Sequence, residues 1–109
     1  MRFLVKVNIP VEAGNKAVKD GVLGKTIQKI LSEQKPEASY FIADNGMRTG
    51  ILIIQMDDAS KIPSIAEPWF LAFNAGVEIV PVMLPQDLQK AADSIASSAK
   101  AYAQEHASI

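Results

Sequence analysis

The first residues of the chain alternate between apolar and polar side chains, which is the pattern of a strand with one buried face. Pro10 follows this segment and is expected to end it, because proline has no backbone N–H for a ladder. Within residues 2–9, one face carries Phe3, Val5, Val7 and Ile9, and the other carries Leu4, Lys6 and Asn8. The pattern therefore predicts a half-buried first strand.

A helical pattern follows between Asn15 and Pro36. Apolar residues recur at helical spacing, at Val18, Leu23, Ile27, Ile30 and Leu31, the last four as i, i+4, i+7 and i+8. Gly14-Asn15 is the expected helix start, with Asn15 as the N-cap. Gly21 and Gly24 lie inside the pattern, where a glycine costs about 1 kcal/mol relative to alanine. We therefore expect a helix that is loose or broken near these glycines.

Residues 40–56 predict a β-hairpin. The dipeptide Asn45-Gly46 suits a type I′ turn, since both central residues of that turn need a positive φ. After the turn, residues 50–54 are a glycine followed only by large apolar side chains. A strand of this kind needs cover on both faces, and so it is expected in the middle of a sheet.

The next segments predict a helix, a strand and a last helix. Asp58 or Ser60 is expected to cap the helix, and Pro68 to end or kink it before a short aromatic segment. Residues 77–84 predict a fourth strand, which Pro81 confines to a sheet edge or a bulge. The last helix opens near Pro85 and carries a thin heptad seam formed by Leu88, Ala92, Ile95, Ala99, Tyr102 and His106.

This order of elements is the β-α-β-β-α-β pattern of ferredoxin-like folds, an α+β class with an antiparallel sheet. We expect a ferredoxin-like domain over residues 1–84, with the first and third strands central. The C-terminal helix over residues 85–109 would pack on the same domain or on a partner subunit. Two crossover helices cover only one face of the sheet, yet apolar side chains point from both faces of the sheet. A second copy is the expected cover, in preference to the alanine-rich final helix.

Composition narrows the functional classes. The chain has 109 residues, 49% hydrophobic and 21% charged, as in a single globular domain. A net charge of −1 argues against nucleic-acid binding. No apolar run approaches the roughly 20 residues of a membrane span. Without cysteine there is no disulfide, thiolate nucleophile or cysteine-based metal site, and with no recognisable signal peptide we expect a cytoplasmic protein.

Several motifs occur together in an order that resembles the dimeric α+β barrel superfamily, which includes muconolactone isomerase-like proteins. They are the Asn45-Gly46 hairpin, Asp57-Asp58-Ala59, Pro68-Trp69-Phe70 and the strand over residues 77–82. The resemblance covers residues 2–84 and implies a homodimer with its two sheets face to face. It also implies a ligand cleft between sheet and helices or inside the barrel. The activities in this superfamily share no single set of catalytic residues, so none is assigned here.

Polar residues on apolar strands and an aromatic cluster are the candidates for binding a small apolar or aromatic molecule. A lysine beside a glutamate on the bare sheet face would have a shifted pKa and could move protons. The alternatives are a structural ion pair at an interface and an aromatic plug at the end of the core. The candidate ligand-binding residues are Lys6, Tyr40, Arg48, Trp69, Phe70, Phe73 and Glu78.

Catalytic residues cannot be assigned from this sequence, and no metal or cofactor is expected. His106 is the only histidine and has no partner at a recognisable spacing. Asp57 and Asp58 are explained by a helix start, which favours carboxylates. Three functions stay open: a small dimeric barrel protein that binds an apolar molecule, a non-enzymatic homodimerisation module with a filled barrel, and a cofactor-free isomerase or monooxygenase.

Overall fold

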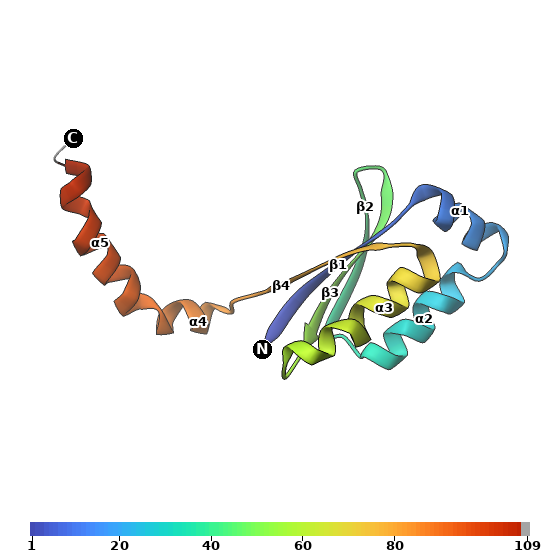
Figure 1. The fold of residues 1–109 in the computed structure, drawn as a ribbon, viewed down its shortest axis with the longest axis horizontal. Coiled ribbons are helices and arrows are strands. Elements are labelled where there is room, and N and C mark those ends of the chain that lie inside the picture. The colour runs from blue at the N-terminus through green and yellow to red at the C-terminus, as the bar shows by residue number, and fades with distance from the viewer. Residues whose placement is uncertain (108–109) are drawn as a thin grey trace.

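A four-stranded antiparallel sheet lies at the centre of the fold (Figure 1). The computed structural model describes the backbone of residues 1–107 and the side chains of residues 1–103. The sheet order is β2-β3-β1-β4, which confirms that the first and third strands are central and the fourth is an edge. The strands are β1 (Arg2–Ile9), β2 (Ala38–Asp44), β3 (Met47–Gln55) and β4 (Gly76–Pro81).

Three helices cover one face of this sheet: α1 (Val11–Lys19), α2 (Leu23–Gln34) and α3 (Ile62–Phe73). The core lies between them and the sheet, because one side of each central strand meets the apolar sides of α2 and α3. The buried core residues include Val5, Val7, Ile9, Leu52, Ile54, Ile30, Ile65, Trp69 and Phe73. The architecture is therefore an α+β fold with an open antiparallel sheet.

The first helix begins earlier than the sequence predicts. α1 starts at Val11, directly after Pro10, whose φ of −55° already suits a helix entry. Asn15 is therefore not an N-cap, and it lies inside the helix. The predicted break is confirmed: α1 and α2 are separate helices, and Gly21 between them has a φ of +73°.

α3 continues through Pro68 instead of ending there. Its start follows the 3₁₀ turn η1 (Ala59–Lys61), which Asp58 caps by accepting a hydrogen bond from the Ser60 N–H at 2.7 Å. Pro68 cannot donate to the carbonyl of Ser64, four residues earlier. The side-chain amide nitrogen of Gln34 on α2 lies 3.5 Å from that oxygen and donates to the Ile65 carbonyl at 2.9 Å. This neighbouring amide compensates for the missing N–H.

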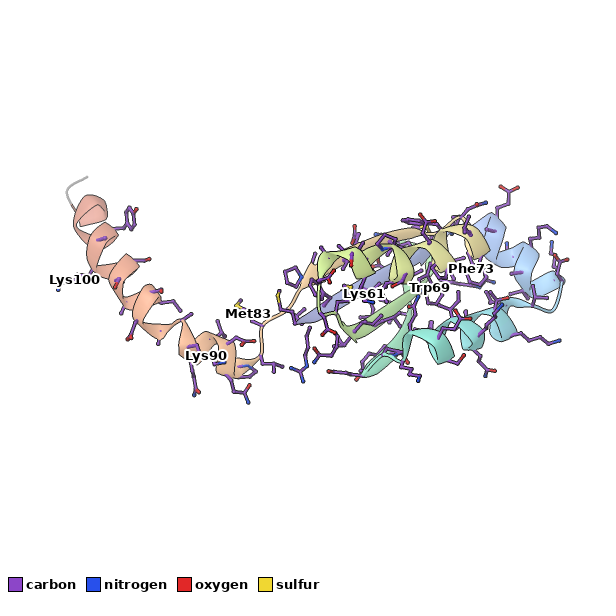
Figure 2. All side chains as sticks on the ribbon, turned by 60° about the horizontal axis from the view of Figure 1, so that its bottom comes forward. Lys61, Trp69, Phe73, Met83, Lys90 and Lys100 are labelled. Atoms are coloured by element: carbon purple, nitrogen blue, oxygen red, sulfur yellow. The ribbon has the colours of Figure 1, made fainter. Side chains whose placement is uncertain are left out.

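The last segments leave the sheet. β4 ends at Pro81, short of the predicted Leu84, because only one further ladder bond forms, from the Val82 N–H to the Arg2 carbonyl at 3.1 Å. The predicted final helix is divided into α4 (Pro85–Lys90) and α5 (Ala92–Ala107). Figures 1 and 2 show both helices projecting away from the sheet as an arm, and the molecule is 63 Å long.

The arm does not cover the sheet. Its described side chains are almost all exposed, including the predicted seam residues Leu88, Ile95 and Tyr102. The side chain of His106 lies outside the described residues. The face of the sheet opposite α1–α3 is therefore left open by the chain's own helices.

Candidate functional site

The open face of the sheet carries exposed apolar side chains. Tyr40 is 62% exposed, Ile42 46% and Val80 49%. By strand register, Leu4 and Ile53 point to the same side of the sheet as Val80. They lie on the central strands β1 and β3, between Val80 on β4 and Tyr40 and Ile42 on β2. Apolar side chains from all four strands therefore meet on a surface that no helix or strand of the described residues covers, and we call this surface the open face.

An ion pair interrupts the open face. The Lys6 Nζ lies 2.8 Å from Asp44 Oδ2 at the end of β2, and Glu78 lies directly opposite Lys6 on β4. Hydrogen bonding and the charge of Asp44, with a smaller contribution from Glu78, raise the pKa of Lys6 above its ordinary value. This lysine is therefore held as an ammonium ion and is not a proton acceptor at neutral pH. The sequence prediction placed Lys6 beside Glu78 and missed Asp44.

The aromatic candidates do not form one pocket. Trp69, which is 1% exposed, and Phe73 lie on the side of α3 that faces the core (Figure 2). Their ring centroids are 6.2 Å apart. The indole Nε1 of Trp69 donates to Gln34 Oε1 at 3.3 Å. Phe70 is partly exposed on α3, and Tyr40 lies on the other side of the sheet, on the open face.

A cleft of about 330 Å³ opens between α2 and the β2–β3 hairpin, and we call it the hairpin cleft. Its walls are mostly apolar, and among the candidate residues predicted from the sequence it contains only Arg48. It is lined by Ile9, Leu23, Ile27, Phe41, Ile42, Ala43, Arg48 and Thr49. Leu23 and Ile27 reach it because they occupy adjacent turns on one side of α2. The remaining candidates therefore lie elsewhere, on the open face, in the core or on α3.

A larger hollow of about 490 Å³ lies between α1 and the end of α3, and Phe73 borders it. Charged groups line its α1 side, and Lys16 and Asp20 there already pair with each other at 2.8 Å. Those two charges are thus satisfied within one helix. The hairpin cleft is the better candidate site, because its walls are apolar and its single charge is not paired in this way.

Arg48 is held at the hairpin cleft by α1. Its Nη1 donates to Asn15 Oδ1 at 3.0 Å, and its side chain packs over Gly14. A Cβ at Gly14 would lie 2.6 Å from that Nη1, so only glycine leaves room for the guanidinium in this position. Sequence reasoning missed this role, because Gly14 and Asn15 were interpreted as a helix start.

Gly14→Ala is expected to displace Arg48 from Asn15 without unfolding the protein. The atom in conflict is the far end of a flexible side chain, and alanine favours the helix by up to about 1 kcal/mol. Chemical denaturation should show equal or higher stability, while the NMR resonance of the Arg48 Nε–H shifts. Gly24→Ala is the control, since a Cβ there meets nothing within 4 Å. A loss of more than about 1 kcal/mol in Gly14→Ala would show that Arg48 is fixed rigidly.

The fold and the cleft define a small α+β protein with an open four-stranded sheet, and comparison with known proteins gives its family. Residues 1–96 match the family described as "Domain of unknown function (DUF3303)", and the chain belongs to this family. No curated protein matches the chain. Within the described residues, no helix has the length and apolar character needed to cross a membrane.

One solved structure with a similar arrangement is a formyltetrahydrofolate deformylase from Pseudomonas putida KT2440. It is 16% identical to this chain, with a TM-score of 0.47. The match covers 75% of this chain and 29% of that chain, so the present protein corresponds to less than a third of the deformylase. At this level of similarity the comparison carries no argument about function.

Proposed function

We propose that the protein binds a small apolar or aromatic molecule in the hairpin cleft. The observation that carries this proposal is the cleft itself, about 330 Å³ in volume and walled by Leu23, Ile27 and Phe41. Sites for small molecules are typically concave, mostly apolar and about 300 to 1,000 Å³ in size, with a few polar groups that orient the ligand. Arg48 at the cleft is such a polar group.

We also propose a homodimer of the dimeric α+β barrel type, built from two ferredoxin-like protomers in the cytoplasm. Its support is the open face, where Tyr40, Ile42 and Val80 are exposed on the side without helices. Burying apolar surface yields about 25 cal/mol per Å², so a second sheet placed on this face is strongly favoured. An isologous pairing about a two-fold axis satisfies both copies at once.

The arm fits the same proposal. A helix of 16 residues without tertiary contacts is marginal in water, since most helical stability in proteins comes from packing. Leu88, Ile95 and Tyr102 are exposed on α4 and α5. In the proposed dimer the arm packs on the partner subunit, where these side chains are covered.

The second candidate function is a homodimerisation module without a ligand. The core position of Trp69 and Phe73 favours it, because the aromatic residues expected to wall a pocket fill the interior instead. The ion pair of Lys6 gives no support to a third function, a cofactor-free isomerase or monooxygenase, since a lysine with a raised pKa is a poor base.

Saturation-transfer NMR with a panel of small aromatic molecules separates the two candidates. We expect the unmodified chain to transfer saturation to members of the panel, and Ala43→Trp to abolish the transfer by placing an indole in the hairpin cleft. Ser39→Trp is the control, because Ser39 is an exposed residue of the same strand outside the cleft. Silence across the whole panel, or transfer unchanged by Ala43→Trp, would overturn the proposed site.

A further inference from the structure

We infer that the hairpin cleft selects small apolar molecules that carry a single carboxylate, with Arg48 as the group that binds it. This inference rests on the proposed function above and specifies its ligand class. Arg48 is the only charged residue among those that line the cleft. The walls bind the apolar body of the ligand, and the guanidinium binds its charged end.

Arg48 is available to an anion. The ion pairs of the described residues join Arg2 to Glu37, Lys6 to Asp44 and Lys16 to Asp20, and none of them includes Arg48. Its side chain donates a hydrogen bond to the neutral side-chain oxygen of Asn15. That bond orients the guanidinium without cancelling its charge.

The chemistry of the guanidinium points to a carboxylate. The group has five N–H donors in a planar fork that matches the two oxygens of a carboxylate. One donor is taken by Asn15, which leaves enough for a bidentate contact. The hydroxyl of Thr49 lies on the other side of the sheet, because Thr49 pairs with Asn8 and Ile42 in register, and it donates to Asn8 Oδ1 at 3.0 Å. A second anionic group on the ligand would therefore meet apolar walls, and this favours monocarboxylates over dicarboxylates.

Binding of 3-phenylpropionate and 3-phenylpropionamide to the full chain, measured by isothermal titration calorimetry at pH 7, tests the inference. The two probes share shape and apolar surface, and only the first is an anion. Hydrogen bonds to charged groups are the strong class, so we expect the carboxylate to bind at least about tenfold more tightly than the amide.

Arg48→Met should remove this preference, because the carboxylate then loses far more affinity than the amide. Arg48→Lys keeps the charge but not the fork, and should give an intermediate preference. Lys29→Met is the matched control, since it removes one positive charge from an exposed position of α2 outside the cleft. It should retain the full preference, which excludes a general effect of net charge.

The outcomes separate the two proposals. Equal affinity for both probes, or a preference that survives Arg48→Met, overturns the carboxylate inference and leaves an apolar site in place. Failure of both probes to bind, together with silence across the NMR panel, overturns the proposed function itself. Far-UV circular dichroism of each variant shows that the fold is retained in these comparisons.

Discussion

Ile53→Asp should convert the proposed dimer into monomers or aggregates. Ile53 lies on the open face of β3, opposite Leu4 of β1 and Ala38 of β2. In the dimer its side chain is buried against the partner, and a carboxylate there would lose its hydration without gaining a counter-charge. Light scattering of the purified variant should therefore give a monomer mass or a large aggregate.

Leu71→Asp is the control for this substitution. Leu71 is 81% exposed on α3, on the helical side of the sheet, so the same chemical change there should leave the dimer intact. A well-folded Ile53→Asp dimer would contradict the assignment of the open face as the interface.

Trp69→Ala should destabilise the protein by about 3 to 5 kcal/mol, which is the usual effect of removing a buried aromatic side chain. Trp69 is among the largest fully buried side chains and joins α3 to α2 through Gln34. Since small domains have a total stability of about 5 to 15 kcal/mol, the variant should be close to unfolding. The midpoint of urea denaturation measures the loss.

Phe70→Ala is the neighbouring control and should cost much less, because Phe70 is partly exposed on the same helix. If Trp69→Ala lost no more stability than Phe70→Ala, the aromatic cluster would not be the centre of the core. Trp69 would then regain its place as a candidate ligand contact.

Local chemistry made the hairpin and the strand order predictable. Asn45 and Gly46 have φ values of +51° and +75°, as the type I′ turn requires, and this dipeptide could be read without knowledge of the fold. The apolar run of β3 likewise predicted a central strand, and the proline of β4 predicted an edge strand. These features depend on neighbours in sequence, and so a pattern reveals them.

The sequence predictions are wrong or incomplete where the local structure depends on a residue that is distant in sequence. The helix through Pro68 is supported by Gln34, which lies on another helix and leaves no trace in the local pattern. Lys6, in the middle of β1, pairs with Asp44 at the end of β2, although β3 lies between these two strands in the sheet. A wider comparison of strand faces across the hairpin would have suggested this pair.

The candidate site was only partly visible in the sequence for the same reason. Arg48 was singled out as a polar residue at the start of a strand, but its partners Gly14 and Asn15 come from a helix more than 30 residues away. Leu23 appeared only as an apolar position of a helix and Phe41 only within the predicted hairpin, since their meeting across the hairpin cleft depends on how α2 packs on the sheet. A cleft is a property of packing between elements, which periodicity within one element does not specify.

Sedimentation equilibrium of the unmodified chain at micromolar concentration tests most directly whether a second copy covers the open face. The account predicts a mass of twice 11.8 kDa. A mass of 11.8 kDa that persists up to several hundred micromolar would show that the exposed sheet remains in contact with water, and would contradict the account.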